Sequence, residues 1–373
     1  MSRIQLPLIL LLNEIITLLA GVLIFIVGAA IAETQGNAGY SSLYLSLAVP
    51  GVLFSTVIGS AVSFFSSVTI LRVSSILSLV LSSFLIDVEM SLAVVMGIAF
   101  IFSILSQARS IAFFSICSCN VPDQQQTIFQ GKIVSLNSLV RITTPAIALF
   151  LSNGISAGDL LVLFSTINVI VAVALYWSTL NLVRESSGNI LVSIVTHLPK
   201  GYPWKALFIT YYRCVQTIIV TTVSAEWLLL DNYQQASFNF VLMGVAVTMV
   251  GVLMVYNCRN IPEIPVLVIY SLLLVLFLVL KANAWLVFVT LFLYTLYESI
   301  LASKIKIMAT PDDAPYFASW FQWSTGMGMI IGYVAVIINP DFFQTGNLFF
   351  ILPVAVAGCL IAVILRTESF RIS

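Results

Sequence analysis

Apolar runs long enough to cross a membrane recur along the 373-residue chain and are separated by short polar connections. A helix needs about 20 apolar residues to cross the hydrocarbon core of a bilayer. The runs are continuous and lack the alternation of a membrane barrel, so they predict helices. We place these helices at about Leu6–Ile31, Leu43–Phe65, Val68–Ile86, Leu92–Phe114, Ile133–Leu151, Leu160–Leu180, Trp204–Leu228, Phe240–Val255, Val266–Leu280, Trp285–Ala302, Phe317–Ile338 and Phe349–Leu365. The sequence therefore predicts an all-α polytopic membrane protein with about twelve transmembrane helices.

The composition excludes most other classes of protein. Hydrophobic residues make up 60% of the chain and charged residues only 8%, whereas a soluble domain carries roughly 25% charged residues. A soluble enzyme, a nucleic-acid-binding protein and a disordered protein are all incompatible with these values. The five cysteines are scattered and the only histidine is His197, so we expect no metal centre and no cofactor. No enzymatic motif pairs a nucleophile with a base.

The basic residues indicate how the chain is oriented in the membrane. A cytoplasmic N-terminus puts twelve basic residues on the inside, leaves Lys281 outside, and places Arg141 and Arg213 within spans. The twelve are Arg3, Arg72, Arg109, Lys132, Arg184, Lys200, Lys205, Arg259, Lys304, Lys306, Arg366 and Arg371. The positive-inside rule favours this orientation, with both termini cytoplasmic. Short loops and the absence of a large soluble domain suggest a bacterial inner membrane.

The longest polar connection divides the predicted spans into two sets of six. It runs from Arg184 to Pro203 and is rich in Asn, Gly and Ser. We therefore predict an N-terminal bundle at 1–183, a cytoplasmic linker at 184–203 and a C-terminal bundle at 204–373. The first and seventh spans each carry polar residues about nine positions in, which suits a parallel duplication.

Local motifs between the fourth and fifth spans carry a family resemblance. Val121-Pro122-Asp123-Gln124, then Asn137-Ser138-Leu139 and Thr144-Pro145-Ala146, resemble the corresponding stretch of macrolide and enterobactin exporters in the major facilitator superfamily. The resemblance implies two six-helix bundles around a central cavity, lined by the first, fourth, seventh and tenth helices and by the fifth.

Two signatures of that superfamily are altered here. Where its loop between the second and third helices has Gly followed by Asp, this chain has Gly59 followed by Ser63. The antiporter signature of the fifth helix is reduced to Thr144-Pro145-Ala146-Ile147-Ala148-Leu149, in which only the proline is kept. Both departures weaken the prediction of a standard gating cycle, whereas the predicted fold of two six-helix bundles is unaffected.

Ionisable residues within spans are costly, and each is therefore a functional hypothesis. The chain places Glu14, Arg141, Arg213 and Glu298 there. We interpret Glu14 and Glu298 as proton-coupling residues. The alternative for Glu14 and Arg141 is a purely structural ion pair. Arg213 is interpreted either as a substrate contact or as a structural partner of another charge.

Polar and aromatic residues recur at helical spacing beside these groups and predict a substrate site facing the cavity. The predicted substrate-binding residues are Asn13, Gln107, Asn137, Arg141, Arg213, Gln216, Tyr294, Tyr297, Trp320 and Trp323. For the two tryptophans the alternative is ordinary packing between helices.

Together these features predict a secondary active transporter that works by alternating access. We expect proton-coupled efflux of a small amphipathic, drug- or siderophore-like molecule, because apolar and aromatic residues dominate the spans and no ATP-binding loop is present. The alternatives are uptake by the same machinery and a transport-inactive receptor or scaffold. The expected partners are the substrate, protons and the lipid bilayer, with no nucleic acid, and we expect a monomer.

Overall fold

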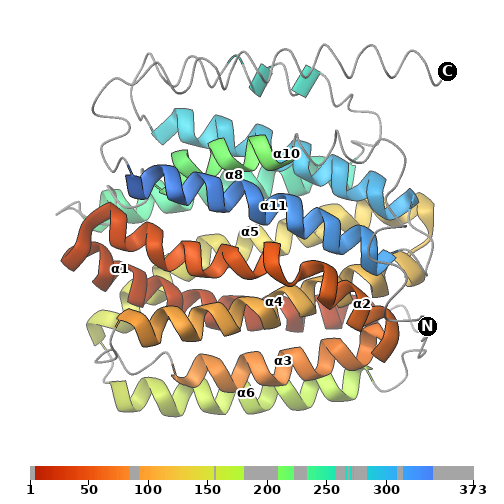
Figure 1. The fold of residues 1–373 in the computed structure, drawn as a ribbon, viewed down its shortest axis with the longest axis horizontal. Coiled ribbons are helices and arrows are strands. Elements are labelled where there is room, and N and C mark those ends of the chain that lie inside the picture. Colours follow the sequence, from red (N-terminus) through yellow and green to blue (C-terminus); the bar gives the residue numbers. More distant parts are fainter. Residues whose placement is uncertain are drawn as a thin grey trace.

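The computed structural model describes residues 5–84, 92–154, 157–179, 209–221, 233–256, 265–266, 269–270, 272, 284–308 and 314–338. Helices account for nearly all of these residues, and no strand occurs among them. The helices are α1 (Gln5–Leu53), α2 (Ser55–Phe65), α3 (Ser67–Phe84), α4 (Leu92–Asn120), α5 (Asp123–Gly154), α6 (Ala157–Thr179), α8 (Tyr233–Tyr256), α10 (Ala284–Met308) and α11 (Ala314–Ile338), with a further helical segment at 209–221. They lie side by side along a common direction (Figure 1).

The predicted all-helical class is confirmed for this part of the chain. In it, four helices are long and apolar enough to cross a membrane, or five if a bent pair counts as one span. The structure thus supports a multi-pass membrane protein, while the expected total of about twelve spans is not tested. The predicted span Phe349–Leu365, the linker 184–203 and most of Val266–Leu280 lie outside the described residues.

The first predicted span and the beginning of the second lie on two arms of α1, which fold back on each other at Gly36 (Figure 1). Gly36 has φ 63° and ψ −158°, a backbone conformation that is essentially restricted to glycine. A methyl group there would meet nothing within 4 Å, so the backbone conformation, not crowding, requires glycine. Tyr40 on the second arm packs against Gly28 on the first, which holds the two arms together.

The second predicted span, Leu43–Phe65, is not one straight helix. It consists of the second arm of α1 and of α2, which are bent by 56° relative to each other. The bend follows Pro50 by one turn, and the backbone N–H of Phe54 donates to the Pro50 carbonyl at 2.9 Å. Proline acts directly on the turn before it, because it has no N–H and its ring crowds that turn.

The fifth predicted span, Ile133–Leu151, is part of a longer helix. α5 begins ten residues earlier, at Asp123, although its first turns are rich in glutamine. Gln126 is buried there and its amide donates to the carbonyl oxygens of Cys117 and Val121 at 3.3 and 2.8 Å. Hydropathy marks where a helix enters the membrane, whereas glutamine remains a good helix former outside it.

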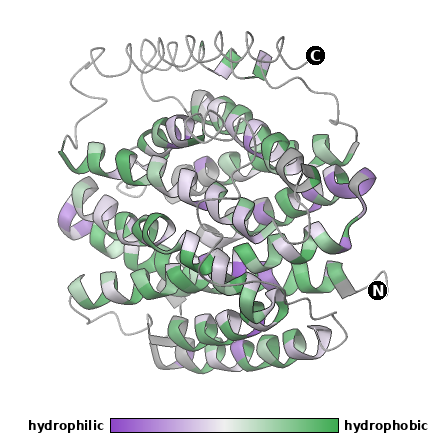
Figure 2. Cartoon of the chain, turned by 45° about the vertical axis from the view of Figure 1, so that its right-hand side comes forward, coloured by the Kyte–Doolittle hydropathy of each residue, from purple (hydrophilic) through white to green (hydrophobic). Residues whose placement is uncertain are grey.

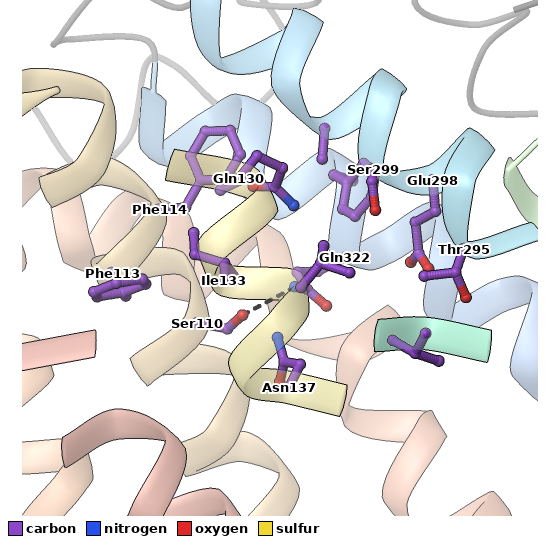
Figure 3. Close-up of a pocket in the computed structure, with 15 residues that line it drawn as sticks. Ser110, Phe113, Phe114, Gln130, Ile133, Asn137, Thr295, Glu298, Ser299 and Gln322 are labelled. Carbon is purple, nitrogen blue, oxygen red and sulfur yellow. Dashed lines mark hydrogen bonds between the residues drawn. The ribbon is translucent and has the colours of Figure 1, made fainter. Parts of the chain in front are cut away.

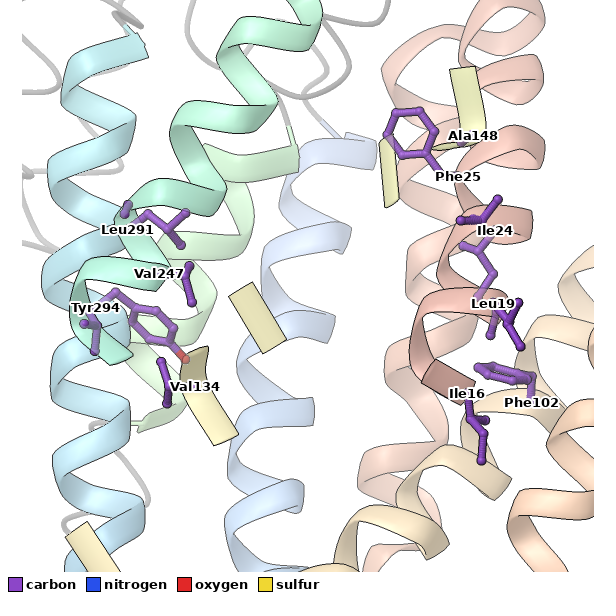
Figure 4. Packing of buried hydrophobic residues seen from close by; sticks show 14 of the residues in the cluster. Ile16, Leu19, Ile24, Phe25, Phe102, Val134, Ala148, Val247, Leu291 and Tyr294 are labelled. Carbon is purple, nitrogen blue, oxygen red and sulfur yellow. The ribbon is translucent and has the colours of Figure 1, made fainter. Parts of the chain in front are cut away.

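Exposed apolar side chains cover the outer helices, as expected for surfaces that face lipid. On α6, Val162 is 67% exposed and Ile170 62% exposed. Figure 2 shows hydrophobic residues over most of the helical surface. A buried core of apolar residues runs through the interior of the bundle, with Ile16, Leu19 and Phe102 in one part and Val134, Val247 and Leu291 in another (Figure 4).

The helices have a common end, here named the proximal end, at which α1 begins and α4 passes into α5. Ile9, Ile116, Val121 and Ala318 pack in one buried cluster at this end. In Figure 1 it lies on the right, beside the N-terminus and α2. We refer to α1–α6 as the N-terminal group, and to segment 209–221 with α8, α10 and α11 as the C-terminal group.

Candidate functional site

A cavity of about 250 Å³ lies between the two groups of helices. Its walls come from α4 and α5 of the N-terminal group and from α8, α10 and α11 of the C-terminal group (Figure 3). The lining residues are Ser110, Phe113, Phe114, Gln130, Ile133, Val134, Asn137, Val247, Thr295, Glu298, Ser299, Ala302, Ala318, Phe321 and Gln322. Because both groups contribute, any relative movement of the groups changes the shape of the cavity.

The cavity lining combines hydroxyl and amide groups with aromatic rings and one carboxylate. Glu298 provides the carboxylate, and Thr295 and Ser299 lie next to it on α10. Across the cavity, the Gln322 amide donates to the Ser110 hydroxyl at 3.2 Å, which joins α11 to α4. This is the lining of a site for a small molecule with polar and apolar parts.

Of the predicted site residues, Asn137 and Glu298 line this cavity together. They come from α5 and α10, one from each group. Gln107 lies elsewhere on α4, where its side-chain amide approaches Gly51 on α1. Arg141 lies within α5, but its side chain is outside the described part of the structure.

A second polar cluster lies in the N-terminal group on α1 and α4. The Asn13 amide donates to the Glu14 carboxylate at 3.2 Å, and Glu14 is only 4% exposed. Arg109 on α4 is 3% exposed, donates to the Thr17 hydroxyl at 3.0 Å and is close enough to Glu14 for electrostatic attraction.

Arg109 is therefore a candidate functional residue that the sequence analysis missed. Counting it among the cytoplasmic basic residues was wrong, since the structure buries it beside Glu14. The signal in the sequence was its position inside the predicted span Leu92–Phe114, five residues before the end of that span. A buried arginine beside a buried carboxylate lowers the cost of both charges.

A third polar cluster lies in the C-terminal group around Arg213 in segment 209–221. Its guanidinium donates to the Tyr294 hydroxyl at 3.4 Å and to the Met329 sulfur at 3.5 Å. It also lies 5.6 Å from the centre of the Tyr294 ring. Tyr294 is one helical turn from Glu298, so this cluster adjoins the α10 wall of the cavity.

The other predicted substrate-binding residues lie in packed surroundings. Gln216 accepts a hydrogen bond from the Tyr270 hydroxyl at 2.9 Å and is buried, and the buried Tyr297 ring lies 5.9 Å from that of Tyr212. Trp320 and Trp323 are half-buried and pack edge to face, with ring centres 5.7 Å apart. These contacts suit a structural role, and a substrate contact by these residues stays a prediction.

The two groups are in close contact at the proximal end. A methyl group added at Gly131 on α5 would lie 2.7 Å from the backbone nitrogen of Val255 on α8. One added at Gly251 on α8 would lie 2.8 Å from the backbone nitrogen of Ser135 on α5. The backbones of α5 and α8 can approach this closely only because both positions are glycine.

Two further contacts join the groups at this end. Thr127 on α5 and Ser303 on α10 share a buried hydrogen bond of 3.1 Å. Gly59 on α2 packs against α11, where an added methyl group would lie 2.9 Å from the Ser319 Cβ. We call the contacts at Gly59, Gly131, Gly251 and Thr127 the proximal contacts. Four of the helices that make these contacts, α5, α8, α10 and α11, also line the cavity.

Comparison with known proteins places this architecture among membrane transporters. No protein-family model and no curated protein sequence matches the chain. Solved structures do: the human organic anion transporter MFSD10 (TETRAN) matches with a TM-score of 0.72 and 13% identity, over 98% of this chain and 100% of that one. The likeness is in fold. This chain shares the fold of that transporter.

A bacterial homologue of the iron transporter ferroportin gives the same result. Its outward-facing structure with soaked iron has a TM-score of 0.70 and 14% identity, over 97% of this chain and 98% of that one. A second outward-facing structure of a bacterial ferroportin homologue has a TM-score of 0.68, also at 14% identity, and 98% of each chain is covered. The likeness in fold thus extends over almost the whole chain, whereas none of these neighbours is described as a drug or siderophore exporter.

Proposed function

We propose that this protein is a secondary active transporter that carries a small amphipathic molecule out of the cell in exchange for protons. The observation that carries the proposal is the cavity walled by both groups of helices, with the carboxylate of Glu298 in its lining. The fold shared with solved transporters over nearly the whole chain supports transport as the activity.

The proximal contacts support alternating access as the mechanism. They consist of glycine backbones in contact and one hydroxyl–hydroxyl bond, so separating the groups there breaks few strong interactions. By the distribution of basic residues the proximal end is the cytoplasmic one. Transport then requires a second state in which these contacts are open.

Ion coupling is assigned to the buried carboxylates. Glu298 lies in the cavity wall, and Glu14 lies among Asn13, Thr17 and Arg109 in the N-terminal group. A carboxylate whose surroundings change between two access states can take up a proton on one side and release it on the other. The neighbouring arginines attract both carboxylates electrostatically.

Gly59 weakens the case for a transport-inactive receptor. The carboxylate expected after this glycine is replaced by Ser63, yet Gly59 still packs tightly against Ser319 on α11. The contact between the groups at this position therefore forms without the charged residue. Uptake by the same machinery remains the main alternative, because a structure of one state does not fix the direction of flux.

The substrates of the structural neighbours differ from one another. One is described as an organic anion transporter and the others as homologues of an iron transporter. At 13–14% identity neither description transfers to this chain. The drug- or siderophore-like substrate is proposed from the resemblance of residues 121–146 to exporters of those molecules.

The test uses inside-out membrane vesicles that contain the protein and have an acidic lumen. They are incubated with an extract of the producing cells, and mass spectrometry identifies what accumulates. We expect accumulation that depends on the pH gradient and is lost in Glu298→Gln and Glu14→Gln. Glu33→Gln is the matched control, because Glu33 is an exposed carboxylate on α1.

The outcomes separate the alternatives. Accumulation in wild-type and Glu33→Gln vesicles, but not in the other two variants, supports proton-coupled export. Accumulation only in right-side-out vesicles would indicate uptake. A wild type that never differs from empty vesicles, across several extracts and both orientations, would favour the receptor or scaffold.

A further inference from the structure

We infer that Arg213 is the anchor for an acidic group, and that the substrate is a small organic anion with one carboxylate on an aromatic or apolar body. This inference rests on the proposed transport function and specifies the substrate class. It assigns Arg213 a role in binding and excludes a purely structural one.

The hydrogen bonding of Arg213 is incomplete in a way that points to a missing acceptor. Its hydrogen bond to the Tyr294 hydroxyl, 3.4 Å, is longer than the 2.7–3.2 Å usual for N–H donors to oxygen, and its other hydrogen bond, 3.5 Å, goes to the Met329 sulfur. A thioether sulfur is a weak acceptor. The Nε group is buried and has no hydrogen-bond partner among the described residues. A guanidinium normally recruits a carboxylate or phosphate in a fork-like geometry.

Glu298 does not fill this role in the structure. It attracts Arg213 electrostatically, but no hydrogen bond joins the two side chains in the described part of the chain. Glu298 instead lines the cavity one turn further along α10. Arg109 also has one buried nitrogen without a hydrogen-bond partner, Nη1, but its hydrogen bond to the Thr17 hydroxyl is of ordinary length, 3.0 Å.

The surroundings of Arg213 supply the rest of a carboxylate site. The Tyr294 hydroxyl accepts from Arg213, which places a second polar group beside the guanidinium. Tyr333 on α11 is also close enough to interact electrostatically with Arg213. The Arg213 side chain is only partly buried, so an acidic group can reach it.

The adjoining cavity indicates the body of the ligand. Phe113, Phe114 and Phe321 provide aromatic contacts, and Ser110, Asn137 and Gln322 provide neutral hydrogen-bonding groups. Among the described lining residues, Glu298 is acidic and none is basic. A ligand with a carboxylate at Arg213 and an uncharged ring in the cavity matches both the arginine and the aromatic lining.

The test measures binding of three probes that share an indole ring and differ in charge: indole-3-acetate, indole-3-acetamide and tryptamine. Purified full-length protein in lipid nanodiscs is titrated with each probe by calorimetry. We expect indole-3-acetate to bind about ten times or more tightly than the amide, and tryptamine to bind most weakly. Arg213→Gln should make the acetate and the amide bind equally, and Arg213→Lys should retain part of the preference.

Arg72→Gln is the matched control, since it removes a positive charge from a different site. Arg72 donates to Thr179 at 2.6 Å and stacks on Tyr176, away from the cavity. The preference for the acetate should persist in this variant. Thermal melting without ligand gives a second measurement: a ligand anchor predicts that Arg213→Gln melts at or above the wild-type temperature, whereas a structural arginine predicts a lower melting temperature.

Each result decides the inference. A preference for the acetate that is lost in Arg213→Gln and kept in Arg72→Gln supports it. It would be overturned by equal binding of the three probes, by no binding of any of them, or by a preference that survives Arg213→Gln. Proteoliposome transport of the acetate is measured separately: selective binding without gradient-driven transport refutes the proposed function but leaves the anion site intact.

Discussion

Gly251→Ala should shift the protein toward the state that is open at its proximal end. The added methyl group would lie 2.8 Å from the backbone nitrogen of Ser135 and 2.9 Å from its Cα. Non-bonded carbon atoms sit at about 3.5–4.0 Å, so α5 and α8 must separate locally by roughly 1 Å. Both partners are helix backbone, which has no rotamer to change.

The cost can be estimated from the behaviour of overpacked interiors. Forcing an extra methyl group into a close contact costs about 1–3 kcal/mol. If this contact exists only in the proximally closed state, the same free energy favours the open state by about 5- to 150-fold. Alanine also changes the stability of the helix itself, but equally in the open and the closed state, so this effect does not alter the ratio of open to closed protein.

The assay is hydrogen–deuterium exchange of the protein in nanodiscs, followed by mass spectrometry of peptides. We expect faster exchange in peptides that cover 127–137 of α5 and 247–255 of α8. Gly97→Ala is the control, because a methyl group at Gly97 on α4 would meet nothing within 4 Å. Identical exchange in the two variants would refute the reasoning, as would uniformly faster exchange throughout Gly251→Ala, since that would mean unfolding rather than opening.

Three further changes test other contacts. Thr127→Val removes the hydrogen bond to Ser303, worth about 0.5–1.5 kcal/mol, and should speed exchange in the same α5 peptide by a few-fold; an unchanged rate would exclude this bond from the closure. Arg109→Gln leaves the buried Glu14 with less compensating charge and should destabilise the protein by about 3–5 kcal/mol. Thermal melting in nanodiscs measures the loss, and adding Glu14→Gln to the same chain should recover part of it. Additive effects of those two changes would show that the side chains are not coupled. Tyr270→Phe leaves the buried Gln216 carbonyl without its donor and should cost about 1–3 kcal/mol of stability. Substrate affinity should be unchanged if Gln216 is structural, whereas a selective loss of affinity would place Gln216 in the binding site.

The sequence predicted which ionisable residues lie within spans better than it predicted which of them are close to one another in the structure. Glu14, Arg213 and Glu298 stand out because an ionisable group inside an apolar run is costly wherever the run lies. The structure shows the last two near each other on different helices, with Tyr294 between them. Arg109 was misassigned because a charge near the end of a span looks the same in the sequence whether it faces the cytoplasm or another helix.

The sequence by itself determined the class of protein, since the hydropathy of a segment fixes whether it can reside in lipid, and this is a local quantity. It also determined the fold-back at Gly36 to the extent that a glycine lies between two apolar runs. Only the tertiary structure decided that Gly131 and Gly251 bring α5 and α8 into backbone contact, and that Asn137 and Glu298 share one cavity. These relations depend on how each helix is rotated and where it crosses its neighbours, which is set by side-chain packing between segments far apart in the chain.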